Sequence, residues 1–536
     1  MHTKYVVILG SLMSGLGKGG ITASIMKMLD FYGYKVLPIK FDGYLNYDCG
    51  TMNPYRHGEV FVLNDKSEVD MDFGIYERFI NKDLTGNLSI TGGKLYSNLI
   101  KKERNGEYLG EDVQVIPHVT NEIINHIRTI SESEKPDVIV IEVGGTVGDI
   151  ENSYFIEAMR QLAIKDKTVF INLTYVPTLE VVGEQKTKPA QIGFRTILQS
   201  GIMPSFVICR SKDKLLAKTK KKLALFTNLD ESRIIDDEDQ MTLYKLPISF
   251  MSQKMDKMLI KDLGLPERKI NKQKLLIWKA TVDKILNPKG SVNIAILGKY
   301  TNLQDSYASV KEALIHCGAK LNTRVNISWI ESEKLESGTD PSAVFADIDG
   351  VIVPGGFGNR GIEGIISGIK YCREQNIPYL GICLGMQLMV VEYARNVCGL
   401  KDANSSEFNK NSKNKVIDLM KSQLGRRVKG GTMRLGLEES KVADKKSIAY
   451  SSYGSLAIQE RHRHRYEFNN RYMDLMKKNG LQFTSFSLDK IVETVEWPGY
   501  AGIGTQAHPE LRSRIEKPAP LFEYLVSKAL LRREKT

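Results

Sequence analysis

Short apolar runs, each followed by a glycine-rich turn and a helical stretch, recur along the chain in two separate series. The runs of the first series are residues 5–9, 36–39, 138–143, 168–173 and 205–208. Continuous apolar strands of this kind are typical of parallel sheets that helices cover on both faces. A second series begins at 292–298 and continues through 350–353 and 378–382. The pattern predicts an α/β protein with two doubly wound domains.

The stretch between the two series is rich in lysine and helical in character. It covers residues 266–290 and ends at Asn287-Pro-Lys-Gly290, a turn-forming sequence typical of a linker. We therefore expect domains at 1–265 and 291–536. Within the second domain, residues 401–429 are rich in Asn, Ser and Lys, which predicts a surface loop or a partly mobile insertion.

Composition excludes several classes of protein. No apolar run approaches the ~18–20 residues that cross a bilayer, and the apolar start is expected to be a first strand and not a signal peptide. The six cysteines show no CxxC pairing, which favours the reducing cytoplasm over a disulfide scaffold or a zinc site. The net charge of +12 is not gathered into one basic block, so we expect no nucleic-acid partner and no membrane.

A glycine-rich loop between the first strand and the first helix predicts a phosphate site. It comprises Gly15, Leu16, Gly17, Lys18, Gly19 and Gly20. Backbone N–H groups at a helix start cradle anions, and Lys18 adds a charge for the β and γ phosphates. Gly19 stands where the usual P-loop has a Ser or Thr that touches magnesium, so the metal needs other ligands. The alternative is a tight turn without a ligand.

Carboxylates at strand ends are the candidate metal ligands. Glu142 ends a buried strand, and Asp72 follows an extended stretch. Acidic residues at the carboxyl end of a sheet suit Mg²⁺ held between protein and phosphates. The block Lys186-Thr187-Lys188-Pro189-Ala190-Gln191 and the separate Lys222 indicate either an anion site or solvated surface, and the residues alone leave both readings open.

The second domain carries a candidate nucleophile at Cys383. Gly381 and Gly385 flank it between a strand and a helix, the elbow arrangement that lifts a reactive side chain out of a strained turn. His508, with Glu510 two residues further on, supplies a base and a group to orient it. The amides of the glycine turn 355–358 and of Leu384 are expected to form an oxyanion hole.

Blocks of sequence in a fixed order carry a resemblance over nearly the whole length. They are Gly-Lys-Gly, Gly50-Thr-Met-Asn-Pro, His57-Gly-Glu-Val-Phe, Tyr76-Glu-Arg-Phe, Gly144-Gly-Thr-Val-Gly-Asp-Ile-Glu151, Lys186-Thr-Lys-Pro, Gly430-Gly-Thr-Met-Arg-Leu-Gly436 and Arg461-His-Arg-His-Arg-Tyr466. Together they resemble the CTP synthases, in which an ATP-dependent amidoligase domain is joined to a class I glutaminase domain. The resemblance implies that glutamine is hydrolysed at Cys383 and that ammonia passes inside the protein to the first domain. There ATP phosphorylates UTP, and ammonia displaces the phosphate to give CTP.

The resemblance also implies the ligands of individual residues. The 15–20 loop, Lys40, Asp72 and Asp239 would bind ATP, and Asp72 and Glu142 would bind Mg²⁺. UTP, or CTP as inhibitor, would meet Ser14, Asp149, Ile150, Glu151, Lys186, Thr187, Lys188, Pro189, Ala190, Gln191 and Lys222. Glutamine would meet Gly356, Leu384, Gly385, Met386, Gln387, Glu407 and Arg465. Arg434 lies in a stretch that resembles a lid responsive to GTP, an allosteric activator, and the resemblance further implies a homotetramer and filaments.

The chain departs from the family pattern at several positions. Gly15 replaces a Ser, Gly43 a Pro, Ile75 a His, Ala190 a Thr and Ala507 an aromatic residue, which bears on the tightness of nucleotide binding and not on the reaction class. Three other functions compete with this interpretation. One is a glutamine-dependent amidoligase with another acceptor, and the second is a P-loop ATPase switch with an inactive glutaminase-like domain. The third is a filament-forming protein whose assembly matters in itself.

Overall fold

The computed structural model describes residues 2–181, 183–299, 301, 303–420, 423, 432–499 and 502–535. The chain divides into two compact units. Unit 1 comprises Met1–Asp48 and Ile75–Val282, and unit 2 comprises Cys49–Gly74 and Asp283–Thr536. The segment Cys49–Gly74 (the inserted segment) therefore belongs with the second half of the chain, although it lies within the first series of apolar runs.

Unit 1 follows the predicted alternation of strands and helices. Its elements, in chain order, are β1 (Lys4–Gly10), α1 (Lys18–Phe31), β2 (Val36–Asp42), α3 (Asp72–Ile80, which starts in the inserted segment), β5 (Ser89–Thr91), α4 (Gly92–Arg104), α5 (Thr120–Glu134), β6 (Val138–Val143), α6 (Ser153–Lys165), β7 (Thr168–Tyr175), β8 (Thr178–Leu179), β9 (Glu184–Gln185), α7 (Lys188–Gln199), β10 (Phe206–Ser211), α8 (Ala217–Thr227), β11 (Ile234–Glu238), α9 (Leu246–Ser252), α10 (Met255–Leu263) and α11 (Lys272–Leu286).

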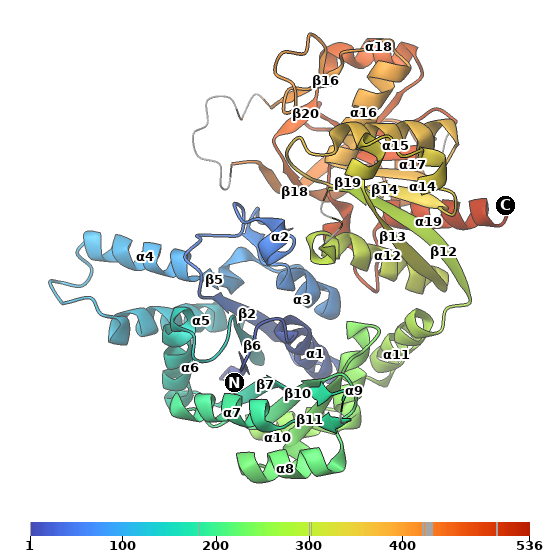
Figure 1. Cartoon of the computed structure of the whole chain (residues 1–536). Helices are drawn as coiled ribbons and strands as arrows, with labels where there is room; N and C mark the ends of the chain where they lie inside the picture. Colours follow the sequence, from blue (N-terminus) through green and yellow to red (C-terminus); the bar gives the residue numbers. More distant parts are fainter. Residues whose placement is uncertain are drawn as a thin grey trace. The chain divides into compact units, whose positions relative to one another are not determined.

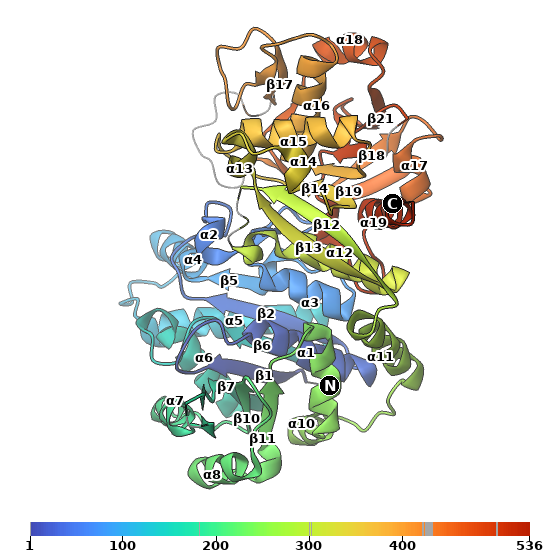
Figure 2. The same cartoon turned by 45° about the vertical axis from the view of Figure 1, so that its right-hand side comes forward.

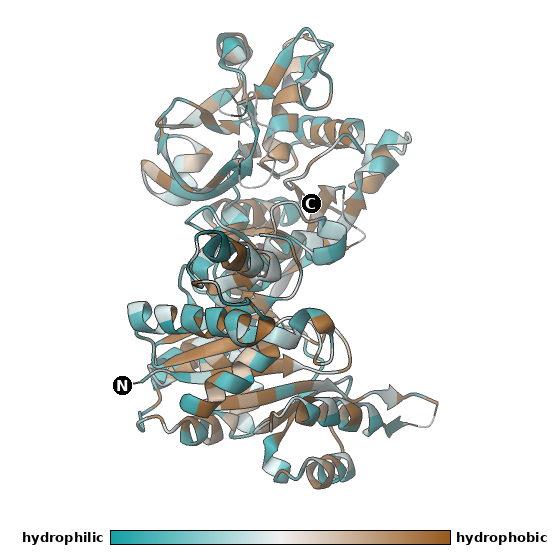
Figure 3. Cartoon of the chain, turned by 90° about the vertical axis from the view of Figure 1, so that its left-hand side faces the viewer, coloured by the Kyte–Doolittle hydropathy of each residue, from teal (hydrophilic) through white to brown (hydrophobic). Residues whose placement is uncertain are grey.

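The main sheet of unit 1 has the strand order β11-β10-β7-β1-β6-β2-β5, and its neighbouring strands run parallel (Figure 1, blue to green). This confirms the predicted parallel sheet. In Figure 3 the strands of this sheet are mainly brown, whereas the helices around it carry many teal residues. All residues of β2 and β6 are buried, as expected for strands covered on both faces.

An aromatic cluster ties the stretch expected to be a linker to unit 1. Trp278 of α11 is buried and donates its indole N–H to the backbone oxygen of Tyr244 at 2.9 Å. Its ring centroid lies 5.5 Å from that of Phe79 and 6.2 Å from that of Phe31. Such contacts contribute beyond the burial of area. The helical character predicted for this stretch is therefore present, and its apolar side is packed.

Unit 2 contains the inserted segment and the second series. Its elements are α2 (Pro54–His57), β3 (Phe61–Val62), β4 (Glu68–Val69), β12 (Gly290–Gly298), α12 (Ala308–Leu321), β13 (Thr323–Glu331), α13 (Ser332–Glu336), α14 (Pro341–Val344), β14 (Gly350–Val353), α15 (Ile362–Glu374), β15 (Tyr379–Ile382), α16 (Leu384–Asn396), β16 (Asn404–Ser405), β17 (Lys415–Leu419), β18 (Arg434–Val442), α17 (Ile448–Tyr453), β19 (Ala457–His464), β20 (Tyr466–Phe468), α18 (Met473–Lys478), β21 (Gln482–Ser487), β22 (Val492–Glu496), β23 (Gly502–Thr505) and α19 (Pro520–Arg533).

The main sheet of unit 2 is mixed. Its order is β13-β12-β14-β15-β23-β22-β21-β18-β19; neighbours from β13 to β23 are parallel, and those from β23 to β19 are antiparallel. Alternate residues of β12 enter different core clusters. Ile294 and Ile296 pack with α12 and α19, and Ala295 and Leu297 pack with α15 and α16 (Figure 2). Helices therefore cover both faces, as predicted for a doubly wound domain.

The stretch 401–429, predicted to be a loop or mobile insertion, is partly regular. Residues 404–405 and 415–419 form β16 and β17, which join β20 in a small sheet. Residues 421–422 and 424–431 lie outside the described part of the chain. Among the helices that are described, none has the length and apolar character needed to span a bilayer.

Candidate functional site

Cys383 is the single residue between β15 and α16. Its backbone has φ +49° and ψ −97°, a conformation that residues with a side chain rarely adopt. The flanking glycines make the turn possible through space: a Cβ at Gly385 would lie 2.1 Å from the Val353 oxygen. A Cβ at Gly381 would lie 2.6 Å from the carbonyl carbon of Gly385. The elbow predicted from the G-x-C-x-G spacing is therefore present.

The sheet brings His508 to the nucleophile, although 125 positions separate them in the sequence. β15 and β23 are parallel neighbours in which Ile382 pairs with Thr505, and the Cys383 N–H donates to the Thr505 oxygen at 2.7 Å. Residues that follow these two strands therefore meet at one edge of the sheet. Cys383, His508 and Glu510 line one cavity of about 690 Å³.

The geometry of His508 suits a proton carrier. Its Nδ1 lies 2.7 Å from Glu510 Oε1, which fixes the proton on Nδ1, and among the described residues its buried Nε2 has no hydrogen-bond partner. Burial lowers the pKa of His508, but the charge and hydrogen bond of Glu510 and the negative charge of the neighbouring Cys383 outweigh burial and raise it to about 10. A Cβ at Gly355 would lie 2.7 Å from the ring, so this glycine lets the loop approach the imidazole.

Charged groups contact the 355–358 turn or line the cavity. Lys299 donates to the Gly358 oxygen, and the Gly358 N–H donates to Glu407 Oε1 at 3.2 Å. Burial lowers the pKa of Lys299 to about 8 despite the nearby Glu407, and burial raises the pKa of Glu407. Arg465 lines the cavity and donates to Gln423 Oε1 at 3.1 Å and Thr432 Oγ1 at 2.8 Å. A carboxylate and a guanidinium are the groups that complement the ammonium and carboxylate of an amino acid.

The other residues expected to bind glutamine lie around the elbow. Leu384, Gly385 and Met386 are buried in the first turn of α16, and a Cβ at Gly356 would lie 3.3 Å from the Leu384 side chain. Gln387 is also buried there and donates to the Tyr466 oxygen at 3.1 Å. These neighbours place the 355–358 turn beside the start of α16, where the two sets of amides were expected to form an oxyanion hole.

The inserted segment supplies part of the cavity, which the sequence did not lead us to expect. Residues 50–55 and 59–60 line it. Tyr55 donates to the Lys299 oxygen at 2.9 Å, and Glu59 accepts from the Ser309 N–H at 2.9 Å. The ordered blocks at 50–54 and 57–61 were visible as family motifs, but nothing in them signalled which half of the chain they join.

In unit 1 the glycine loop lies between β1 and α1 as predicted. Gly15 and Gly17 have φ of +77° and +89°, and α1 starts at Lys18. Lys18 turns back and donates to the Gly145 oxygen, so its ammonium lies beside the 144–151 block. The Val147 N–H also donates to the Gly10 oxygen, at 2.9 Å. The loop and the 144–151 block are therefore held together.

Carboxylates and Lys40 meet at the carboxyl ends of β2 and β6. The Lys40 ammonium lies 3.3 Å from Glu142 and 3.7 Å from Asp42, and all three side chains are buried. Glu142 also accepts from Thr22 Oγ1 at 3.0 Å and from the Tyr76 hydroxyl. The donor chemistry of these oxygens fits Mg²⁺. Asp72 begins α3 and belongs to the inserted segment.

The helix that begins in the block expected to bind UTP packs beside the residue that follows β1 and beside the 144–151 block. A Cβ at Gly193 of α7 would lie 2.4 Å from Ser11 Oγ, and a Cβ at Gly148 would lie 3.4 Å from the Thr196 side chain. Helix α7 starts at Lys188, with Pro189 in its first turn, and Gln191 donates to Thr187 at 3.1 Å. The glycine loop, the 144–151 block and helix α7, which begins within the 186–191 block, therefore lie close to one another in unit 1.

The other residues predicted to contact a nucleotide are Lys186, Lys222, Asp239, Ser14, Ala190 and residues 149–151. Lys186 contacts Glu184 at 2.6 Å, and the charges of Lys186 and Lys222 both act to lower the pKa of Glu184. Asp239 follows β11 and lies 2.9 Å from Arg210. Ser14, Asp149, Ile150 and Glu151 are exposed, whereas Ala190 is buried. A Cβ at Gly43 would lie 2.6 Å from the Glu151 oxygen, so a side chain at this position would require the main chain at residue 151 to move.

Comparisons with known proteins cover both halves of the chain. Residues 4–265 match the family model described as CTP synthase N-terminus, and residues 302–528 match the model described as Glutamine amidotransferase class-I. A CTP synthase from Methanocaldococcus jannaschii is 46% identical over 98% of this chain and 98% of its own length. One from Carboxydothermus hydrogenoformans is 46% identical over 98% of this chain and 99% of its own. One from Pyrococcus furiosus is 47% identical over 98% of each.

The sequence identity with these relatives covers both domains of the chain and is not confined to one of them. The matched region 4–265 contains the glycine loop of unit 1, and the matched region 302–528 contains Cys383, His508 and Glu510. The chain belongs to the CTP synthase family.

Proposed function

We propose that this chain converts UTP to CTP with ATP and with nitrogen from glutamine, and that Cys383 is the nucleophile that releases this nitrogen. The observation that carries the proposal is the strained elbow of Cys383 in one cavity with the His508–Glu510 pair. A domain that is not catalytic would not require a strained cysteine together with a histidine–carboxylate pair. We assign residues 1–265 to the synthase domain, 266–290 to the linker and 291–536 to the glutaminase domain.

The glutaminase half-reaction follows from the groups around Cys383. The sulfur attacks the side-chain amide carbon of glutamine, and the carbonyl electrons move to oxygen, where the amides of Gly356 and Leu384 stabilise the charge. As the C–N bond breaks, His508 gives its proton to the leaving nitrogen, and ammonia departs from a thioester. Water, activated by His508, then cleaves the thioester to glutamate. Glu510 holds the imidazole in one tautomer throughout.

Glutamine itself is held by its backbone groups in this proposal. Glu407 receives the ammonium and Arg465 the carboxylate, while Gly356 and the turn 384–387 line the amide end. The synthase half-reaction transfers the γ-phosphoryl group of ATP to the 4-oxygen of UTP, and ammonia then displaces phosphate at that carbon. Lys18, Lys40 and the N–H groups of the 15–20 loop bind the phosphates of ATP, with Asp239 as a further contact.

Asp72 and Glu142 would hold Mg²⁺, which when bound would neutralise part of the charge of the phosphates. UTP binds to Ser14, the 186–191 block and Lys222, and CTP inhibits at an overlapping site that includes residues 149–151. GTP activates through the stretch that contains Arg434. A homotetramer is the expected assembly.

The test compares nitrogen sources in the full chain. CTP formation from UTP, ATP and Mg²⁺ is followed by absorbance, with glutamine or with ammonium, for the wild type and for Cys383→Ala. We expect the variant to lose the glutamine reaction and to keep the ammonium reaction. ATP cleavage without CTP from either source would contradict the proposed acceptor, and glutamine-dependent CTP formation by Cys383→Ala would contradict the proposed nucleophile.

A further inference from the structure

The register of two strands puts one more side chain next to the nucleophile. Ile382 of β15 pairs with Thr505 of β23, so the residues directly after the pair, Cys383 and Gln506, stand at equivalent positions at the sheet edge. The main chain at Gln506 is fixed from the other side, because its N–H donates to the Glu493 oxygen at 2.8 Å. Gln506 is fully buried, and its Nε2 lies 3.5 Å from Cys383 Sγ, within hydrogen-bond range for sulfur.

The direction of the Gln506 amide follows from its neighbours. The Tyr466 oxygen can only accept, so the Gln387 nitrogen must face it, at 3.1 Å. The second hydrogen of this nitrogen points to Gln506 Oε1 at 3.3 Å. With its oxygen held there, Gln506 has its own N–H₂ group directed at Cys383. The opposite orientation would set two donors against each other.

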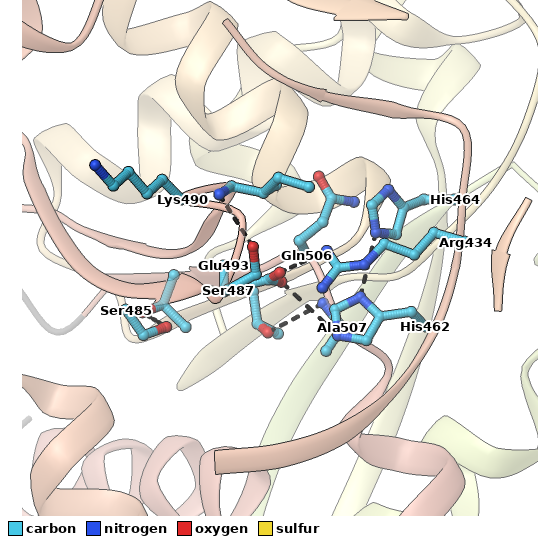
Figure 4. Close-up of polar contacts among 12 residues, drawn as sticks. Arg434, His462, His464, Ser485, Ser487, Lys490, Glu493, Gln506 and Ala507 are labelled. Carbon is cyan, nitrogen blue, oxygen red and sulfur yellow. Dashed lines mark hydrogen bonds and ion pairs between the residues drawn. The ribbon is translucent and has the colours of Figure 1, made fainter. Parts of the chain in front are cut away.

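A second buried chain of hydrogen bonds supports the same carbonyl. His464 Nδ1 lies 3.0 Å from the Tyr466 oxygen and therefore carries the proton, and His464 Nε2 accepts from His462 Nδ1 at 3.2 Å. Burial, with the charge of Arg434, lowers the pKa of His464 to about 3, so both hydrogen bonds persist at neutral pH. Figure 4 shows His462, His464 and Gln506 with Arg434, which forms an ion pair with the buried Glu493.

We propose that Gln506 is a further catalytic residue of the glutaminase site: its side-chain amide donates to Cys383 Sγ and stabilises the sulfur as a thiolate. Gln387 and the Tyr466 carbonyl act as positioning groups that hold this amide in its donating orientation. The assignment rests on the proposed role of Cys383 as nucleophile.

A neutral donor suits this place. The site is buried, so an N–H directed at sulfur interacts more strongly than it would in water. Gln506 carries no charge and so does not compete with His508 for the proton that ammonia needs. Another polar neighbour of the sulfur in the described part of the chain is the Arg463 oxygen at 3.9 Å, which can only accept a hydrogen bond from the thiol. Gln506 is thus the neutral donor among these groups.

The experiment measures how alkylation of Cys383 by iodoacetamide depends on pH in the full chain. The Cys383 peptide is quantified by mass spectrometry, which separates it from the other cysteines. In Gln506→Leu we expect the midpoint of the alkylation profile to move up by about one to two pH units. We expect glutamine-dependent kcat/KM to fall about 10- to 100-fold. Ammonium-dependent CTP formation stays at the wild-type rate and shows that the chain is folded.

Matched variants separate the hydrogen bond from packing. Gln482→Leu removes an exposed glutamine of β21 in the same unit and should leave the profile unchanged. Gln506→Glu keeps the size and polarity of the side chain but replaces the donor with an acceptor, so it should move the midpoint at least as far as Gln506→Leu. A wild-type alkylation profile in either Gln506 variant overturns the proposal. This readout needs no CTP synthesis, so it is independent of the Cys383→Ala test.

Discussion

The two strand–turn–helix connections to which we assign the chemistry differ in the length of the turn between strand and helix. In unit 1, residues 11–17 separate β1 from α1, and Gly15 and Gly17 take positive φ. In unit 2, Cys383 alone separates β15 from α16 and takes the positive φ itself. A long glycine loop offers many N–H groups to a large anion, whereas a one-residue elbow presents a single reactive side chain. The length of each turn therefore matches the group that it presents: several backbone N–H groups in unit 1 and one side chain in unit 2.

Glycine is also required for a different physical reason in each connection. Gly17 needs its left-handed backbone, and a Cβ there would meet nothing within 4 Å. Gly385 has no such backbone requirement, but a Cβ there would collide with the main chain of β14. The first glycine is required by conformation and the second by space.

The largest expected effect distinguishes the two connections by nitrogen source. Lys18→Ala removes the ammonium at the start of α1, so CTP formation should fall on the order of a thousandfold with glutamine and with ammonium alike. Steady-state rates with each nitrogen source measure it, and Lys257→Ala, an exposed change in α10, is the control. A Lys18→Ala chain that keeps the ammonium reaction would remove Lys18 from the phosphate site.

The next effect concerns the base in unit 2. Glu510→Gln removes the carboxylate that raises the pKa of His508, so the pKa falls and the alkaline limb of the glutaminase pH profile should move to lower pH. The glutamine-dependent kcat should drop by about a hundredfold. Glu534→Gln, near the end of the chain, is the matched control. An alkaline limb that stays in place would mean that Glu510 does not set the charge of His508.

A pair of glycine substitutions sharpens the contrast between conformation and space. Gly385→Ala should cost about 3 kcal/mol in the free energy of unfolding and abolish the glutamine reaction, because the backbone of β14 must move. Gly17→Ala should cost only about 1–2 kcal/mol, the strain of a left-handed residue, and should mainly raise the KM for ATP. Thermal unfolding and kinetics of both variants measure this, and equal costs would contradict the distinction.

The last expected effect is a pH dependence of stability in the antiparallel half of the unit 2 sheet. Burial raises the pKa of Glu460 to about 7, above its ordinary value of 4.5, so the folded state holds a proton that the unfolded state releases. Its contribution to stability is present at pH 4.5 and is lost as pH rises towards 7, by at most about 3 kcal/mol. Glu460→Gln should flatten this part of the unfolding profile while Glu493, with a similar pKa, retains its share. If the free energy of unfolding of Glu460→Gln depends on pH as steeply as that of the Glu534→Gln control, the assignment to Glu460 is wrong.

Local patterns predicted what local sequence determines. The strands, the glycine loop and the elbow of Cys383 each depend on a few consecutive residues, and the structure has them where the sequence indicated. The antiparallel strands β18, β19, β21 and β22 were not anticipated, because their alternation is interrupted by buried charges such as Arg461 and Glu493. Strands β16 and β17 lie in a polar stretch whose composition favoured a loop.

Contacts that depend on strand order escaped the sequence. Sequence analysis did not single out Gln506, because its approach to Cys383 requires that β23 lie beside β15 and in this register. The sequence likewise did not show that the inserted segment belongs to unit 2. Arg461 donates to Asn64 at 2.7 Å and Arg463 to Glu68 at 2.8 Å, across nearly 400 positions of sequence. A signal did exist for Gln506, since it follows one buried strand as directly as Cys383 follows another.

The inserted segment has a consequence for how the protein is made. Its partners in unit 2 begin at residue 283, so during translation residues 49–74 leave the ribosome long before anything exists for them to pack against. The surrounding parts of unit 1 can fold as they emerge, but this segment can pack only after the rest of the chain has been made. Until then Phe61 and Val62, which are buried in the folded protein, stay exposed to water. The slowest step of biosynthetic folding is therefore expected to be the docking of this segment, and a chaperone that shields it would act on residues from the first fifth of the protein.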